Sequence, residues 1–281
     1  MPAREGGNER IRWEYALVMT AGRRLALIDL LEEQDVFAVD DLARRFAVST
    51  QTIRRDLRAM ETQGLLRRTY GGAITRGAPH SLEHNFLSRA EERRSEKEAI
   101  ALAALPLLCP GQTIMFDASS TVLHLARRLP PDFEGTAVIN SLPIGIELGK
   151  RHRLNITFLG GAMRHTSLSF AGPMAEAAMH RLFVDCAVIS ARGCGVGQGL
   201  TEANPFEARL KELVVANAAR VIALIDSSKL GKAALMHFAP LSRVETLVTD
   251  PGADPEMIAS LRAAGMTIII AEPPAVAAKT G

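Results

Sequence analysis

Two groups of side chains in this sequence have the types and spacing to bind a polar partner. The first is a run of Gln, Thr and Arg within STQTIRRDLRAMETQ, residues 49–63. Arg can form two hydrogen bonds to guanine, Gln can do the same to adenine, and further arginines can bind phosphate. The second group consists of Asp, Asn, Ser and Thr residues that follow short apolar runs after residue 112. Their oxygen and nitrogen atoms suit a ligand with hydroxyl or phosphate groups.

The stretch 49–63 is predicted to be one amphipathic helix that ends at Gly64. Ser49 is a suitable N-cap, because its hydroxyl can accept a hydrogen bond from an amide of the first turn. An apolar stripe should face a small core, and it comprises Val48, Ile53, Leu57 and Met60. The predicted DNA contacts on this helix are Ser49, Gln51, Thr52, Arg54, Arg55 and Arg58. A solvated surface helix would have a similar composition, so this helix alone does not decide between the two.

The flanking segments favour DNA binding. Amphipathic helices are predicted at 23–33 and 39–46, and a tight turn joins the second to Ser49, as in a helix-turn-helix. After Gly64, the sequence LLRRTYGGAI predicts a β-wing that turns at Gly71–Gly72 and exposes Arg67, Arg68 and Tyr70.

The charge distribution agrees with this interpretation. Between Arg44 and Arg76 there are eight arginines and two acidic residues, a net charge of +6, whereas residues 1–43 carry −4 and the whole chain only +2. Basic charge concentrated on one helix and one wing is the pattern of a nucleic-acid interface.

The stretch LARRFAVSTQTIRRDLRAMETQGLLRRTYGGAI resembles the winged helix-turn-helix of DeoR-type bacterial transcriptional regulators. The residues that carry the resemblance are Ser49, Thr52, Ile53, Arg54, Arg55, Asp56, Leu57, Arg68, Gly71, Gly72 and Ala73. The resemblance implies a DNA-binding regulator, usually a repressor, that binds a double-stranded DNA operator as a homodimer or homotetramer. It also implies a C-terminal sensor for a phosphorylated sugar or polyol.

The expected domain organisation follows from these patterns. We expect a disordered tail at 1–21, the winged helix-turn-helix at 22–75, a linker with the start of a connecting helix at 76–95, and the sensor domain at 96–281. Met19 is an alternative start. The connecting helix is predicted at 86–105, where Pro106 should end it.

From residue 112 onward, strands and helices alternate. Short apolar runs separated by helical stretches predict an α/β fold with a mainly parallel sheet covered on both faces. The strands are predicted at 113–116, 136–139, 156–159, 186–189, 221–225, 246–248 and 267–270. Helices are predicted at 122–129, 173–182, 206–218 and 255–264.

Polar residues follow four of these strands, where the carboxyl ends of parallel strands meet at one edge of the sheet. The sequence DASST opens a helix, so its hydroxyls and amides could hold a phosphate. The alternative is ordinary helix capping by Ser or Thr. One such strand end would favour capping, whereas four favour a ligand site.

Several later blocks, such as TIMFDASST, VINSLP, GLTEANPFEARLK and DSSKLGKAAL, are similar to those of the DeoR-type sensor domain. That domain resembles ribose-phosphate isomerases in fold. Carried over by position, the implied effector-binding residues are Asp117, Ser119, Ser120, Thr121, Asn140, Ser141, Glu207, Lys211 and Lys229. Lys229 is a candidate counter-ion for phosphate. Glu207 and Lys211 could instead form a surface ion pair, with Lys229 in a loop.

The segment 190–195 departs from the family, which often has a turn of the type Gly-Ala-Asp-Gly here. Arg192 stands in place of an acid, and it could serve a more anionic ligand or point to solvent. The glycines of GCGVGQG do not form a GxGxxG motif, and we expect a flexible loop.

Other features narrow the class of protein. Three cysteines without a CxxC pair fit a reduced, cytoplasmic setting, and no apolar run is long enough to span a membrane. HSLEH, at 80–84, has the spacing of an inverted zinc-protease motif, but it follows Pro79 in the linker, so we predict neither a metal site nor a cofactor.

Two alternatives stay open. One is an enzyme, a sugar-phosphate isomerase or transferase with Asp117 and Glu207 as base and acid. The other is an activator rather than a repressor.

Overall fold

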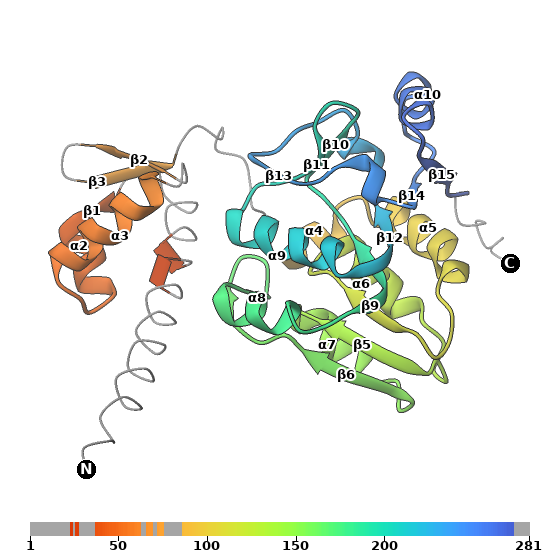
Figure 1. Ribbon diagram of the computed structural model, residues 1–281, viewed down its shortest axis with the longest axis horizontal. Helices are drawn as coiled ribbons and strands as arrows, with labels where there is room; N and C mark the ends of the chain where they lie inside the picture. Colours follow the sequence, from red (N-terminus) through yellow and green to blue (C-terminus); the bar gives the residue numbers. More distant parts are fainter. Residues whose placement is uncertain are drawn as a thin grey trace, which may run out of the picture.

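A computed structural model describes residues 23–24, 26–27, 37–62, 66–69, 72–75 and 86–272 (Figure 1). The predicted tail, Tyr70, and the HSLEH segment lie outside these residues. Within the described part, no helix has the length and apolar character needed to cross a membrane.

The N-terminal elements form a helix-turn-helix beside a small sheet. The helices are α2 (Val39–Arg45) and α3 (Thr50–Thr62). The strands β1 (Phe37–Ala38), β2 (Leu66–Thr69) and β3 (Gly72–Thr75) pair antiparallel in the order β1-β3-β2. The predicted wing is therefore present, although Gly72 begins β3 opposite Thr69 rather than lying in the turn.

The predicted apolar stripe of α3 faces a small core. Ile53, Leu57 and Met60 are buried there, and Val48 packs against them. Residues from the preceding helices complete the core, namely Leu27, Val39, Leu42 and Ala43.

The C-terminal part contains a seven-stranded sheet in which every pair of neighbouring strands is parallel. Its order is β15-β14-β12-β9-β4-β5-β6. The strands are β4 (Thr113–Phe116), β5 (Gly135–Ile139), β6 (Leu154–Phe158), β9 (Val184–Ile189), β12 (Ala218–Leu224), β14 (Thr246–Thr249) and β15 (Thr267–Ile270). All seven predicted strands are confirmed, with bounds that differ by a few residues.

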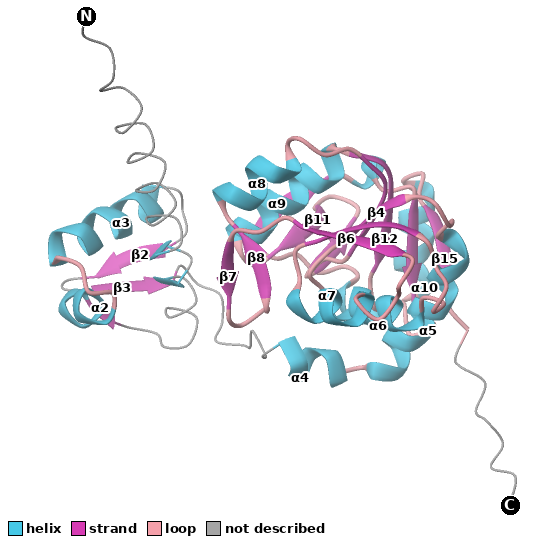
Figure 2. Ribbon diagram, turned by 90° about the horizontal axis from the view of Figure 1, so that it is seen from below, coloured by secondary structure: helices cyan, strands magenta, loops and turns pink. Residues whose placement is uncertain are grey.

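Helices cover both faces of this sheet (Figure 2). Side chains alternate along each strand, so Met115 belongs to one core cluster, while Ile114 and Phe116 belong to the other. The first cluster includes side chains of α8 (Pro173–Met179), α9 (Pro205–Ala216) and α10 (Pro255–Ala263). The second includes side chains of α4 (Phe86–Glu91), α5 (Arg94–Ala104), α6 (Ser120–Arg128) and α7 (Leu142–Leu148). Together they confirm the predicted α/β fold.

The single helix predicted at 86–105 is wrong, because the chain breaks between α4 and α5. Arg93 adopts a left-handed backbone conformation with φ 49°. The ammonium group of Lys97 donates hydrogen bonds to the carbonyls of Arg89 and Glu92, which satisfies the C-terminal end of α4. As predicted, no α-helix continues through Pro106, which lies in the 3-10 turn Leu105–Leu107.

The flexible loop predicted at GCGVGQG is also wrong. These residues form a hairpin of β10 (Gly193–Gly195) and β11 (Gly199–Glu202), and β13 (Met236–Ala239) pairs with β11. Gly193 allows this packing, since a Cβ there would collide with the carbonyl oxygen of Lys232. A second short hairpin joins β7 (Ala162–Arg164) to β8 (Ser169–Ala171).

The strand order places a switch point at the centre of the sheet. From β4 the chain adds β5 and β6 on one side, then returns to place β9 on the other side of β4 and continues outward to β15. In open α/β sheets, ligands bind beyond the carboxyl ends of the strands at such a switch point. The ends of β4 and β9 are therefore the expected place for a site.

Helix α6 begins at this switch point, and a buried arginine fixes its other end. Arg151 donates hydrogen bonds to the carbonyls of Arg127, Leu129 and Glu147, and pairs with the Glu147 carboxylate at 3.0 Å. These bonds satisfy the last carbonyls of α6.

We expect Arg151→Met to lower the free energy of unfolding by about 2–4 kcal/mol, because several charge-assisted hydrogen bonds are lost from a buried site. Urea titration would measure this. The control is Arg153→Met, since the Arg153 side chain is 69% exposed and lies 3.8 Å from Glu134; it should change stability by less than about 0.5 kcal/mol. Equal effects of the two substitutions would contradict the role given to Arg151.

Candidate nucleic-acid interface and effector site

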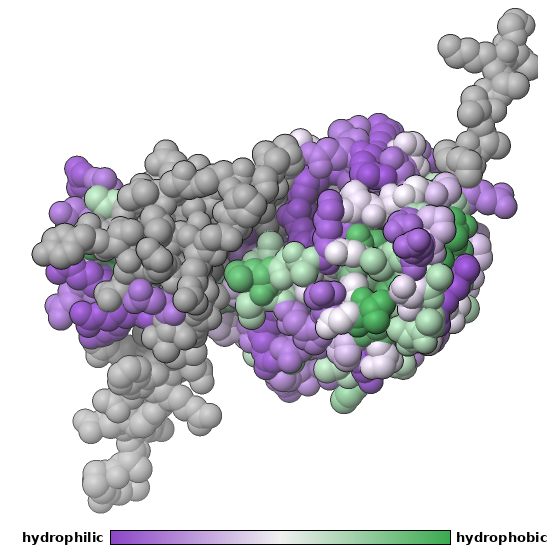
Figure 3. All heavy atoms as spheres, turned by 90° about the horizontal axis from the view of Figure 1, so that it is seen from above, coloured by the Kyte–Doolittle hydropathy of each residue, from purple (hydrophilic) through white to green (hydrophobic). Residues whose placement is uncertain are grey.

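Helix α3 begins as the sequence predicts. The Ser49 hydroxyl accepts a hydrogen bond from the Thr52 amide at 3.1 Å and lies 2.9 Å from the Thr52 hydroxyl. Gln51, Arg54 and Arg55 are exposed, as is Arg58. The described surface of this end of the molecule is mostly hydrophilic in the view of Figure 3.

Asp56 lies on the opposite side of α3 from these arginines and is buried. Its carboxylate accepts hydrogen bonds from the Nε atoms of Arg23 (2.7 Å) and Arg24 (3.0 Å). Two charge-assisted hydrogen bonds from an earlier helical segment thus fix α3 on the side that carries Asp56. The remaining arginines of α3 can then face a partner.

The wing residues are only partly placed. Arg67 and Arg68 lie in β2, and Tyr70 is outside the described residues. DNA contact by all nine predicted residues of the helix and wing stays a prediction.

The second candidate site lies at the switch point of the large sheet. Asp117 follows β4, and Ser190 follows β9. The Asp117 carboxylate accepts a hydrogen bond from the Ser190 amide at 3.2 Å. The Asp117 amide in turn donates to the Val188 carbonyl at 3.0 Å. The two strand ends are therefore joined directly.

Lys211, on α9, joins these strand ends to the β10–β11 hairpin. Its buried ammonium group lies 3.1 Å from Asp117 and 2.8 Å from Glu202, and it donates to the Ser190 carbonyl at 2.7 Å. Burial alone would lower the pKa of Lys211, but the surrounding carboxylates outweigh burial and raise it. Burial raises the pKa of Asp117, and Lys211 opposes that rise.

Glu207 forms a second buried ion pair, with Arg164 at 2.7 Å. The Arg164 side chain is fully buried and also donates to the Ser167 hydroxyl, while Ser169 donates to Glu207 at 2.8 Å. Burial alone would raise the pKa of Glu207, but Arg164 and then Lys211 outweigh it and hold that pKa well below its usual range. The sequence did not reveal this pairing, because Arg164 and Glu207 are far apart along the chain.

Buried polar atoms that lack a hydrogen-bond partner within the described residues gather at this edge of the sheet. Four of the six such atoms are Thr121 Oγ1, Ser141 Oγ, Ser190 Oγ and Asn204 Nδ2, which we call the open polar groups. Buried polar groups are normally satisfied, so each one points to a missing partner. Ser190 and Asn204 come from the strand end after β9 and the start of α9.

Of the other predicted effector residues, Ser119, Asn140 and Lys229 have partners within the structure. Ser119 caps α6 by accepting from the Val122 amide at 3.1 Å, so ordinary capping holds for this residue. Asn140 accepts from the Ala118 amide at 3.1 Å, and Ser120 is buried in the first turn of α6. Lys229 pairs with Asp226 at 3.2 Å.

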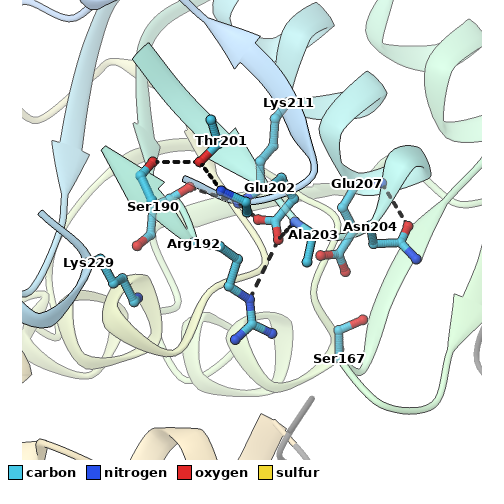
Figure 4. Close-up of polar contacts among 12 residues, drawn as sticks. Ser167, Ser190, Arg192, Thr201, Glu202, Ala203, Asn204, Glu207, Lys211 and Lys229 are labelled. Carbon is cyan, nitrogen blue, oxygen red and sulfur yellow. Dashed lines mark hydrogen bonds and ion pairs between the residues drawn. The ribbon is translucent and has the colours of Figure 1, made fainter. Parts of the chain in front are cut away.

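Figure 4 shows the polar groups around the β10–β11 hairpin, with Arg192 extending between Lys229 on one side and Ser167 and Glu207 on the other. Sequence reasoning missed Arg164, Glu202 and Asn204 as members of this site. Their only signal was their position within blocks that resemble the sensor domain.

No cluster of His, Cys, Asp or Glu that could hold a metal occurs among the described residues. The groups proposed as acid and base in the enzyme alternative, Asp117 and Glu207, are each bound by a buried cation.

The fold and the two sites together define a class: a DNA-binding protein with an α/β sensor for a small molecule. The family model for the DeoR-like helix-turn-helix domain matches residues 23–76, and that for the DeoR C terminal sensor domain matches residues 92–251. The chain belongs to the DeoR family of transcriptional regulators.

Its relatives cover nearly the whole chain. It is 33% identical to the HTH-type transcriptional regulator GlpR of Haloferax volcanii, over 90% of this chain and 98% of that protein. It is 33% identical to the transcriptional repressor AccR of Agrobacterium fabrum (83% and 90% covered) and 32% identical to the L-fucose operon activator of Escherichia coli (83% and 96% covered). These names confirm the prediction of a regulator rather than an enzyme.

Among solved structures, ribose 5-phosphate isomerase of Methanocaldococcus jannaschii is 18% identical over 48% of this chain and 53% of that chain, with a TM-score of 0.36.

The Arg164–Glu207 pair makes folding depend on acidity. The folded pKa of Glu207 is depressed, so its contribution to stability is fully present above about pH 4.3, the ordinary value, and is lost as the pH falls below it. The slope from one such group reaches about 1.4 kcal/mol per pH unit.

We therefore expect Glu207→Gln to be less stable than the wild type at pH 7 and to lose less stability between pH 4.5 and 3.5. Urea unfolding at several pH values would measure both effects. Glu91→Gln, which removes a carboxylate that is 62% exposed and paired with Arg94, is the control and should keep the wild-type slope. An unchanged slope in Glu207→Gln would contradict the depressed pKa.

Proposed function

We propose that this protein is a repressor of a sugar or polyol catabolic operon, and that a phosphorylated sugar or polyol releases it from DNA. The observation that supports this most is the set of open polar groups at the switch point, beside the first turn of α6. Hydroxyls and an amide that need partners match the hydroxyls of a sugar. The N-terminal turn of a helix favours an anion such as phosphate.

Release requires that the effector bind the DNA-free conformation more tightly than the DNA-bound one. A tenfold preference supplies about 1.4 kcal/mol of coupling, and a hundredfold preference about twice that. By reciprocity, operator DNA weakens effector binding by the same factor.

On the DNA, a homodimer or homotetramer would place one α3 helix in the major groove at each half-site. Arg54, Arg55 and Arg58 are exposed there, and Asp56 holds the helix from behind. Exposed arginines at the start of a recognition helix read bases and bind phosphate.

The double variant Arg54→Ala with Arg55→Ala should lower affinity for DNA of the protein's own regulatory region by about 100-fold or more, because each contact contributes about 1–3 kcal/mol. The salt dependence of binding should also become less steep. Fluorescence anisotropy at several salt concentrations would measure both. Arg127→Ala with Arg128→Ala removes two exposed arginines from the end of α6 and should leave binding unchanged. Unchanged DNA affinity in the variant with Arg54→Ala and Arg55→Ala would contradict the assignment of α3 as the recognition helix.

The effector site is tested by Thr121→Val, which replaces a buried hydroxyl among the open polar groups with a methyl of similar size. The ligand-free protein should keep its stability or gain up to about 1 kcal/mol. The affinity of the protein for a compound that releases it from DNA should fall about tenfold. The compounds to screen by thermal shift and DNA release are D-ribose 5-phosphate, D-fructose 6-phosphate, D-glucose 6-phosphate and glycerol 3-phosphate.

The matched control is Thr249→Val. The Thr249 hydroxyl is likewise buried and without a partner among the described residues, but it ends β14, three strands from β4. This variant should bind the effector as the wild type does. If Thr121→Val also binds normally, the open polar groups are not the ligand site.

Activation is the second candidate, since one relative is named an activator and another a repressor. A reporter gene under the protein's own regulatory region separates the two. Deletion of the regulator raises expression if it represses and lowers expression if it activates.

A further inference from the structure

Arg192 lies where the effector site meets the β10–β11 hairpin. It follows β9 by three residues, and its amide donates to the Thr201 carbonyl at 2.9 Å. Its side chain is 23% exposed, with Nε 3.6 Å from a Glu202 carboxylate oxygen. Figure 4 shows that it is directed between Lys229 and Glu207 rather than away from the site.

The Glu202 carboxylate is shared among several groups. Its other oxygen lies 2.8 Å from Lys211, and the oxygen near Arg192 also accepts from the Ala203 amide at 2.8 Å. The single negative charge of Glu202 is therefore shared between two positive side chains, Arg192 and Lys211.

Positive groups crowd one another on this side of the site. The pKa of Lys229 is lowered by burial and by Arg192, although Asp226 opposes both. The pKa of Lys97 is lowered to about 8 by burial and then by Lys229. An anion bound here would relieve this repulsion.

Lys229 lies apart from the first turn of α6. The first turn of α6 follows β4, whereas Lys229 follows β12, and β9 lies between these strands. Two strand spacings correspond to about 9–10 Å. Arg192, which follows β9, extends between Lys229 and Ser167 in Figure 4. A five- or six-carbon chain with an anionic group at each end has the length to reach both places.

We propose that the effector carries two anionic groups, a phosphate held at the first turn of α6 and a second anion, carboxylate or phosphate, held by Arg192 and Lys229. This inference rests on the proposed function. It makes Arg192 the residue that selects doubly anionic effectors over singly phosphorylated sugars.

The experiment measures binding by calorimetry at constant ionic strength, with paired probes that share a carbon skeleton. D-Fructose 1,6-bisphosphate is compared with D-fructose 6-phosphate, and 6-phospho-D-gluconate with D-glucose 6-phosphate. The first pair tests a second phosphate and the other a carboxylate. In at least one pair, the wild type should bind the doubly anionic member at least tenfold more tightly.

Arg192→Gln should remove this preference, with at least a tenfold loss for the doubly anionic probe and less than a threefold change for its partner. Lys229→Gln should act in the same direction, and Arg192→Lys should keep part of the preference. Arg153→Gln, at an exposed arginine, is the control for total charge and should change neither affinity. Urea unfolding confirms that each variant is folded.

Three outcomes would overturn the proposal. If both members of each pair bind with equal affinity, the protein has no binding site for a second anionic group. The proposed function would not be affected by that result. The same holds if Arg192→Gln weakens both members equally. If no phosphorylated compound binds the wild type, the proposed function fails as well.

Discussion

The candidate effector site depends on the interactions of the Lys211 ammonium group. Its three hydrogens have three acceptors at hand, in Asp117, Glu202 and the Ser190 carbonyl. It therefore ties α9, both central strand ends and the β10–β11 hairpin to one point. A buried charge without these partners would be strongly destabilising, so the arrangement holds as a unit. With its three hydrogens engaged in this way, the Lys211 ammonium has no donor left for a ligand.

The pairing of these charges bears on whether Asp117 and Glu207 could act as base and acid. A general base works best with a pKa near the working pH. Arg164 holds the pKa of Glu207 far below that range, and Asp117 is bound to Lys211. The carboxylates of Asp117 and Glu207 are thus engaged with the buried cations Lys211 and Arg164.

The sequence predicted features that depend on local pattern. The bounds of β4 and β15 and the buried stripe of α3 follow from hydrophobic periodicity, which is a property of neighbouring residues. The break at Arg93 could not be predicted in this way, because its side chain bonds to Ser227 and lies 3.7 Å from Asp226 and from Asp250, far along the chain. Arg164 was missed for the same reason, since its carboxylate partner comes from another element.

The joint between α4 and α5 also decides where the sensor begins as a physical unit. Phe86 and Ala90 are buried in the same core cluster as α6, and the His124 ring lies 2.9 Å from the Ala90 carbonyl. The Arg93 guanidinium lies beside the buried carboxylates of Asp226 and Asp250. A fragment cut at residue 96 would leave an apolar groove open and two buried acids without one of their cations. An isolated sensor should therefore start before Phe86 if it is to crystallise or bind ligand as it does in the whole chain.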